Sequence, residues 1–273
     1  MKAIRLVDVT SEGEKLLSLD YKSASQLFQS YSTEQQLAII KAMREPKKRE
    51  ELYYLVPDST ELVQQSKTED VLQVIHTMFG TGLTIGFLSA ISAEQFEEML
   101  DMTIFRDGKL DEEALNTWIG ELAECDEEDL KRLLPQIDIA VLVQMLRGKV
   151  DVSDEPIAGV NAKTYKGQFA EEGILNLNAL EYENEQVRFI METIWRADED
   201  YFMRIMYELF AEEDEFGLES YELEFLRAKE ERDERIHKRD EEIGISIDEE
   251  EMFEEVDLGN LELEDDDEGE DYG

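Results

Sequence analysis

A helix-start signal recurs through the first half of this chain and restricts its architecture. In a capping box, a Ser, Thr or Asp side chain accepts a hydrogen bond from the amide three residues on. An acid or amide side chain at that position bonds back to the first amide. Five pairs fit or approach this pattern: Ser32–Gln35, Asp58–Glu61, Ser66–Glu69, Ser92–Gln95 and, more loosely, Asp126–Asp129. The sequence therefore predicts a series of short helices.

Apolar residues at helical spacing follow these starts, so each predicted helix has one apolar stripe. The starts at Ser32, Ser66, Ser92 and Asp126 lie 34, 26 and 34 residues apart, the scale of an irregular helix-pair repeat. A short amphipathic helix buries its stripe only by stacking on neighbours. We predict an all-α fold: an irregular superhelical stack of short helices, a C-terminal segment of longer helices and a disordered acidic tail.

Composition changes along the chain divide it into five parts. These are an N-terminal arm (1–19), the short-helix superhelical domain (20–150), a linker (151–178), a C-terminal helical segment (179–243) and an acidic tail (244–273). Glycines and asparagines break the period in the linker, where Lys166-Gly167 suggests a short hairpin. All four prolines lie at or before Pro156, so later helices are free to be longer. Asp198 is a candidate cap between two apolar stripes of the helical segment.

The charge balance limits the class of partner. Acidic residues number 69 and basic residues 27, which gives a net charge of −42. Residues 251–273 hold twelve acids and no base. Such a chain is repelled by nucleic acid and by anionic lipid. One cysteine and two histidines exclude an intramolecular disulfide and a multi-Cys or multi-His metal centre.

The segment Val71–Ala93 has no Asp, Glu, Lys or Arg, but Gly80-Thr81-Gly82 interrupts it. We interpret it as a buried helix, a turn and a second buried helix, and not as a membrane span. The glycines also resemble a dinucleotide loop. That loop requires a preceding strand, whereas the residues before Gly80 have a helical pattern, so a turn is favoured. No signal peptide precedes the helices, and we expect a cytoplasmic protein.

Individual reactive residues have ordinary explanations. His76 lies on an apolar helix face and is expected in the core or at its edge. His237 follows Asp233 by four residues, the spacing of an exposed ion pair. Acidic neighbours would raise the pKa of Cys125 and suppress its thiolate, so we interpret it as a bystander. Core packing is likewise expected of the main aromatic residues: Trp118, Trp195, Phe87, Tyr53 and Tyr54.

The densest carboxylate set in the predicted folded part is Glu97, Glu98, Asp101, Asp107 and Asp111. Oxygen ligands of this kind suit Mg²⁺ or Ca²⁺. A solvated acidic surface is favoured, and weak binding of either cation stays open. We assign no catalytic, cofactor-binding or metal-ligating residue and expect no cofactor.

Residues 92–122 carry a family resemblance. Its residues are the run Ser92–Asp101, then Phe105, Leu110-Asp111, Trp118-Ile119 and Leu122. This pattern resembles an uncharacterised bacterial family known only as a domain of unknown function. Phe105 stands where a Trp is usual, and Thr103 where a second acid is common. The segment from Glu222 through Arg227, Arg232 and Arg235 to Gly244 resembles the Arg-rich helix of that family loosely, which extends the resemblance over roughly residues 20–255. The short-helix region is also similar to the cytosolic N domain of MgtE-type magnesium transporters.

The resemblance implies a helical fold and no known chemistry. With no catalytic constellation present, we expect a non-enzymatic helical scaffold or adapter that binds a protein partner. Two alternatives stay open: a regulatory domain that responds to divalent cations, and an acidic mimic of nucleic acid.

Overall fold

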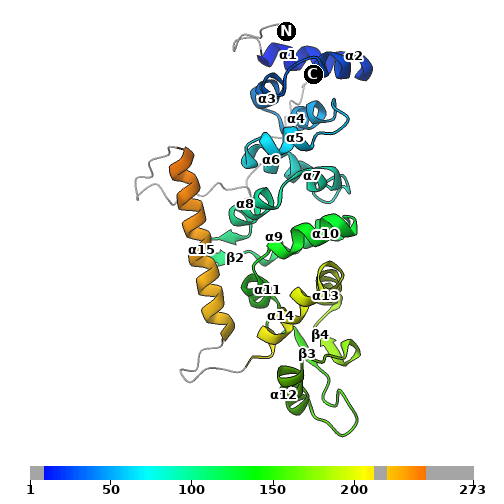
Figure 1. The fold of residues 1–273 in the computed structure, drawn as a ribbon, viewed down its shortest axis with the longest axis vertical. Helices are drawn as coiled ribbons and strands as arrows, with labels where there is room; N and C mark the ends of the chain where they lie inside the picture. Colours follow the sequence, from blue (N-terminus) through cyan, green and yellow to red (C-terminus); the bar gives the residue numbers. More distant parts are fainter. Residues whose placement is uncertain (1–8, 212–219, 244–273) are drawn as a thin grey trace, which may run out of the picture. The chain divides into compact units, whose positions relative to one another are not determined.

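The computed structural model describes residues 9–211 and 220–243. Over these residues the regular structure is almost entirely helical, which confirms the all-α prediction (Figure 1). It divides into two units after Glu230. The helices are α1 (Val9–Ser18), α2 (Tyr21–Gln29), α3 (Thr33–Ala42), α4 (Pro46–Tyr53), α5 (Thr60–Gln65), α6 (Thr68–Met78), α7 (Ile85–Ala90), α8 (Ala93–Thr103), α9 (Glu112–Ala123), α10 (Glu127–Leu133), α11 (Ile139–Leu146), α12 (Ala162–Glu172), α13 (Glu185–Ala197), α14 (Glu199–Leu209) and α15 (Ser220–Ile243).

Two short antiparallel pairs accompany the helices in the described residues. β1 (Phe105–Arg106) and β2 (Lys109–Leu110) form a hairpin between α8 and α9. β3 (Val150–Val152) pairs with β4 (Leu180–Tyr182), with Val152 opposite Leu180. This second pair ties the two ends of the segment that contains α12 to each other.

Several predicted helix starts are confirmed. Ser32 and Ser92 form complete capping boxes with the glutamines three residues on, at the starts of α3 and α8. Asp126 accepts from the amide of Asp129 at the start of α10, although Asp129 does not bond back as a box requires. Asp198 caps α14 by accepting from the amide of Tyr201.

Two predicted capping boxes are wrong. α5 begins at Thr60, so Asp58 lies before the helix and accepts from the Thr60 amide instead of forming a box with Glu61. α6 begins at Thr68, and its N-cap residue Lys67 makes no side-chain cap. The Ser66 hydroxyl is 2.6 Å from the Tyr53 hydroxyl and 2.7 Å from the Leu62 carbonyl oxygen. The Ser66 hydroxyl, which was predicted to cap the next helix, is thus bonded to residues of α4 and α5.

Helices of the first unit pack largely on the next helix but one (Figure 1). α4 contacts α6, α5 contacts α7, α6 contacts α8, and α7 contacts α9. This arrangement lets each short helix bury its stripe against neighbours, as in a helical-repeat stack. The aromatic core prediction is confirmed for Tyr53, Phe87 and Trp118, which are at most 2% exposed, whereas Tyr54 is 43% exposed.

The stack begins earlier than the composition indicated. Residues 9–18 of the predicted arm form α1, whose Leu16 is fully buried against the same core. Gly13 faces the side chain of Met43, so a small residue lets α1 approach its neighbours closely. The signal was weak because α1 has few strongly apolar side chains.

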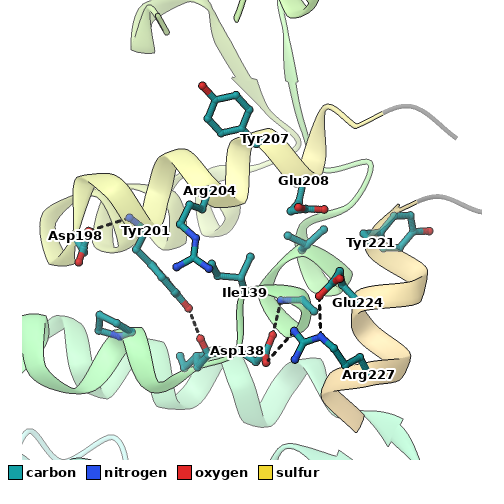
Figure 2. A pocket seen from close by; sticks show the side chains of 14 residues that line it. Asp138, Ile139, Asp198, Tyr201, Arg204, Tyr207, Glu208, Tyr221, Glu224 and Arg227 are labelled. Carbon is teal, nitrogen blue, oxygen red and sulfur yellow. Dashed lines mark hydrogen bonds and ion pairs between the residues drawn. The ribbon is translucent and has the colours of Figure 1, made fainter. Parts of the chain in front are cut away.

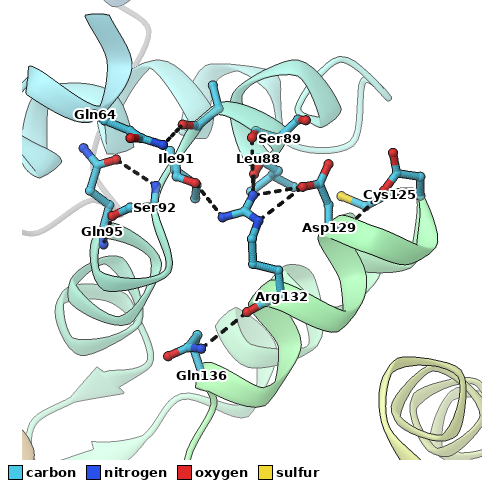
Figure 3. A network of polar contacts seen from close by, with 12 residues as sticks. Gln64, Leu88, Ser89, Ile91, Ser92, Gln95, Cys125, Asp129, Arg132 and Gln136 are labelled. Carbon is cyan, nitrogen blue, oxygen red and sulfur yellow. Dashed lines mark hydrogen bonds and ion pairs between the residues drawn. The ribbon is translucent and has the colours of Figure 1, made fainter. Parts of the chain in front are cut away.

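Polar side chains of later helices in the stack donate hydrogen bonds to backbone carbonyl oxygens in or just after earlier helices. Gln95 of α8 donates to the carbonyl oxygen of Val63 in α5 at 3.0 Å. Arg132 of α10 donates to the carbonyl oxygens of Leu88 and Ile91, at 2.9 and 2.7 Å, and also to Asp129 (Figure 3). These bonds satisfy carbonyls that helix ends leave without an intrahelical partner.

The predicted hairpin at Lys166-Gly167 is wrong, because α12 runs through these residues. Asn161 caps the helix by accepting from the Thr164 amide, and Gly173 ends it with a left-handed conformation (φ 70°). Tyr165 and Phe169 are buried in the core of the first unit. They lie one helical turn apart, but the glycine between them obscured that spacing in the sequence.

α15 confirms that a longer helix lies in the predicted C-terminal helical segment (179–243). It begins in the first unit, where Phe225 stacks on Phe105 of β1 and Ala228 is 4% exposed. From Glu231 onward the helix belongs to the second unit, and the predicted acidic tail lies outside the described residues. Among the described helices, none is both long and apolar enough to cross a membrane.

Candidate functional site

A cavity of about 460 Å³ lies within the first unit, between the start of α11, one face of α14 and the first turns of α15 (Figure 2). Its size is that of a small-ligand or side-chain pocket. It is lined by Pro135, Ile137, Asp138, Ile139, Ala140, Val143, Asp198, Tyr201, Arg204, Tyr207, Glu208, Tyr221, Glu224 and Arg227.

Tyr201, Arg204 and Glu208 line the α14 side of this cavity at a spacing of three and four residues, which places them on one helix face. Tyr201 is buried, and its hydroxyl donates to the carbonyl oxygen of Ile137. Burial, with a contribution from Asp138, raises the pKa of Tyr201 well above its ordinary value. Tyr201 therefore stays a neutral donor that joins α14 to the turn before α11.

An ion-paired arginine joins the start of α11 to α15. Asp138 caps α11 by accepting from the Ala140 amide at 2.9 Å, and its other oxygen is 3.9 Å from Arg227. Arg227 also donates through Nε to Glu224 at 2.8 Å. Nearby, the guanidinium of Arg147 lies 3.8 Å from the centre of the Tyr221 ring, a cation–π contact.

Arg204 lines the cavity from α14, whereas the ion-paired Arg227 lies on α15. Figure 2 shows its guanidinium directed from α14 into the cavity, toward Ile139. It makes no hydrogen bond or ion pair with another residue of the described part of the chain. An arginine offers a planar set of donors that fits a carboxylate or phosphate. The cavity thus presents an accessible cation beside Asp138, Glu224 and Arg227, which interact with one another.

No Ser, Cys or His stands among the described residues that line the cavity. The tyrosines and arginines present here are residue types that are enriched at binding hot spots. The arrangement is suited to recognition.

The structure places the glycine segment outside this cavity. Gly80 and Gly82 have positive φ angles and form the turn between α6 and α7, as predicted. Glu121 of α9 fixes that turn by accepting from the Gly80 amide at 2.7 Å and from the Thr84 hydroxyl at 2.5 Å. A helix precedes the glycines, so the requirement of a dinucleotide loop for a preceding strand is not met.

The other candidate residues have structural surroundings. His76 is half-buried beside the rings of Phe79 and Trp118, and burial lowers its pKa. Burial, more than the acidic neighbours, raises the pKa of Cys125 to about 12, although the predicted direction was correct. In the second unit His237 lies 3.2 Å from Glu241, so the predicted pairing with Asp233 is wrong; Asp233 pairs with Arg232.

The predicted carboxylate set is not brought together. Glu98 accepts from the Thr68 hydroxyl, and Asp111 caps α9. Asp107 has a φ of 51° in the turn of the β1–β2 hairpin. Among the described residues, no group of three or more Asp, Glu, His or Cys side chains is arranged to hold a metal ion. The helix ends and the hairpin separate residues that lie close in sequence.

None of the cavity residues was predicted from the sequence to belong to a site, and Arg204 is the clearest case. A local signal was present, because Tyr201, Arg204 and Glu208 form a second row at helical spacing beside the apolar stripe of Phe202, Ile205 and Met206. Its meaning depends on residues far away in the chain, around 138 and 224. No local pattern indicates that these three segments meet.

Comparison with known proteins gives a family and no closer relative. DUF6178, a family of unknown function, matches residues 25–226. No curated protein and no solved structure matches the chain.

Proposed function

The chain belongs to the DUF6178 family, whose function is unknown, and we propose that it is a non-catalytic helical scaffold or adapter that binds a protein partner. We further propose the bacterial cytoplasm as its location, in line with the resemblance to a bacterial family. The supporting observation is the cavity at α11, α14 and α15, which offers tyrosine, arginine and aliphatic side chains to a partner. Such surfaces bind through a few aromatic and arginine contacts around an apolar centre.

The stack adds support from its architecture. Successive short helices form extended surfaces, and helical-repeat proteins bind partners on them. Beyond the cavity, Leu223 and Leu226 of α15 are 46% and 55% exposed and provide apolar contact area on the same helix. Scattered exposed leucines are common, so we assign the partner to the cavity and treat these two residues as its surroundings.

Affinity capture from native lysate tests this proposal. The full tagged chain, the variant Arg204→Gln and the control Arg44→Gln are compared by quantitative mass spectrometry. Arg44 is also exposed and lies between α3 and α4, so both variants remove one positive charge. We expect a stoichiometric partner with the parent chain and Arg44→Gln and its loss with Arg204→Gln. No partner, or equal capture by all three chains, would count against the proposal.

Two alternatives remain hypotheses that rest on charge. The cation-responsive domain, suggested by similarity to the N domain of MgtE-type transporters, would require a cation site. The described residues contain no three-ligand cluster, so no geometric observation favours it. The nucleic-acid mimic rests on the acidic tail, which lies outside the described residues.

A further inference from the structure

The charged side chains that line the cavity at α11, α14 and α15 differ in whether they are paired. Four carboxylates line it: Asp138, Asp198, Glu208 and Glu224. Asp138 and Glu224 face Arg227, and Asp198 accepts from the Tyr201 amide. Arg204, although in the same cavity, has no hydrogen bond or ion pair with another described residue.

An arginine in this state is ready to bind one anionic group. Its donors match the two oxygens of a carboxylate, and such charge-assisted bonds are stronger than neutral ones. Tyr201 does not compete for the anion, because its hydroxyl already donates to Ile137 and its buried ring stays neutral. A ligand carboxylate would therefore be held by Arg204 itself.

The surroundings of Arg204 are apolar on the α11 side. Ile137, Ile139, Ala140 and Val143 all line the cavity, and Figure 2 shows the guanidinium of Arg204 pointing toward Ile139. A volume of about 460 Å³ accommodates a chain end with one apolar side chain. Apolar area beside the anion would add to affinity by its burial.

The remaining charges exclude ligands that carry many negative charges. The four cavity carboxylates outnumber the two arginines, so an acid-rich peptide or a polyanion would be repelled more strongly than a ligand with one carboxylate that contacts Arg204 directly. A single carboxylate beside an apolar residue matches one arginine beside an apolar wall. The C-terminus of a peptide has this chemistry.

We propose that this cavity binds the C-terminal carboxylate of a partner polypeptide that ends in an apolar residue, with Arg204 as the carboxylate-binding group. This inference rests on the proposed function and specifies the partner of the same site. The α11 residues hold the terminal side chain.

Fluorescence anisotropy with the full chain tests the proposal. The probe is a fluorescein-labelled octapeptide pool of uncharged residues that ends in Leu, Ile, Val or Phe with a free carboxylate. The same pool with C-terminal amides is the first control, and an amidated pool with one internal Glu is the second.

We expect binding of the free-carboxylate pool and little binding of either amide pool. Equal binding of the first two pools, or no binding of any pool, would overturn the proposal. Binding of the Glu-containing pool alone would assign the site to an acidic side chain and also overturn it.

Variants then locate the site. Arg204→Gln is expected to weaken binding of the free-carboxylate pool by about tenfold or more, the effect of losing a charge-assisted bond. Arg204→Lys should restore part of the affinity, because a lysine keeps the charge without the planar donor set. Ile139→Ala should weaken binding through lost apolar contact, whereas Arg44→Gln should bind as the parent does. An unchanged affinity for Arg204→Gln contradicts the proposal.

The two proposals fail in different ways. If lysate capture depends on Arg204 but the free-carboxylate pool does not bind, the scaffold proposal stands and the carboxylate inference is wrong. If no partner is captured but the pool binds through Arg204, the site binds carboxylates and the protein-scaffold proposal loses its support. Thermal melts of each variant check that the fold is kept, which we expect because Arg204 and Arg44 are exposed.

Discussion

Arg132 shows how a single side chain joins neighbouring helices of the stack. Its guanidinium satisfies carbonyl oxygens at the end of α7 while pairing with Asp129 on its own helix (Figure 3). Removing the donor of a part-buried hydrogen bond leaves its acceptor incompletely satisfied, which adds to the cost of losing the bond. Polar residues at such positions therefore act on the packing of two helices at once.

Replacing Arg132 by Ala is expected to lower the free energy of unfolding by about 2 kcal/mol, because carbonyls of Leu88 and Ile91 lose their donor. Urea denaturation followed by circular dichroism measures the change. Lys131→Ala is the matched control, since Lys131 is exposed and 3.7 Å from Glu127. A surface pair of this kind contributes under about 1 kcal/mol. Equal losses in the two variants would show that the carbonyl contacts are unimportant.

The buried thiol of Cys125 gives a second prediction. Its pKa of about 12, raised chiefly by burial, leaves almost no thiolate near neutral pH. Iodoacetamide at pH 8 should therefore label the folded protein far more slowly than the urea-unfolded chain, as measured by intact mass. Rapid labelling of folded protein would contradict the burial of this side chain.

The same shift has a consequence for stability. The thiol titrates near 9.0 when unfolded and near 12 when folded, so the neutral form is favoured by folding. The contribution of this pKa shift to the free energy of unfolding is fully present below pH 9 and is lost as the pH rises toward 12. Cys125→Ala should therefore have a shallower loss of stability over this range than the parent chain.

At the scale of elements, α12 is the clearest case in which sequence reasoning failed. Lys166-Gly167 resembled a turn because glycine is common there, whereas the apolar Tyr165 and Phe169 turned out to share a buried helix face. A glycine inside a helix is tolerated at a cost of about 1 kcal/mol, which tertiary packing can offset. The local preference was thus overcome by burial of two aromatic rings.

Two glycines of α12 should respond oppositely to alanine. Gly167 lies within the helix with no atom near the position of an added Cβ, so Gly167→Ala should stabilise the protein by about 0.5–1 kcal/mol. Gly173 has a φ of 70°, and its added Cβ would lie 2.9 Å from the Tyr207 hydroxyl. Gly173→Ala should destabilise the protein by about 1–2 kcal/mol. Urea denaturation measures both. A destabilising Gly167→Ala would favour the hairpin over the helix.

At the scale of the whole molecule, charge is the dominant property. A net charge of −42 means that folding brings many like charges together. Salt weakens this repulsion, because the Debye length falls from about 30 Å at 0.01 M to about 10 Å at 0.1 M ionic strength. The folded state should gain stability over this range of salt.

Thermal melts in NaCl and in MgCl₂ at matched ionic strength separate screening from specific binding. We expect the Tm to rise with NaCl, and a similar rise with MgCl₂, because the described residues hold no three-ligand cluster. A clearly larger rise with Mg²⁺ or Ca²⁺ at the same ionic strength would instead favour the cation-responsive alternative. Calorimetric titration with Mg²⁺ would then measure how many ions each chain binds.

The sequence by itself determined that this chain forms short helices and where several of them begin. The caps at Ser32, Ser92 and Asp198 were readable because each is a hydrogen bond between residues three apart. The predicted cap at Ser66 failed because its hydroxyl bonds to Tyr53, which lies on another helix.

Only the tertiary structure decided the candidate site. Asp138, Arg204 and Arg227 are separated by tens of residues and line one cavity because α11, α14 and α15 pack together. A local hydrogen bond depends on adjacent residues, whereas a cavity depends on which buried surfaces fit one another. That choice is made by packing across the whole first unit, and no short stretch of sequence contains it.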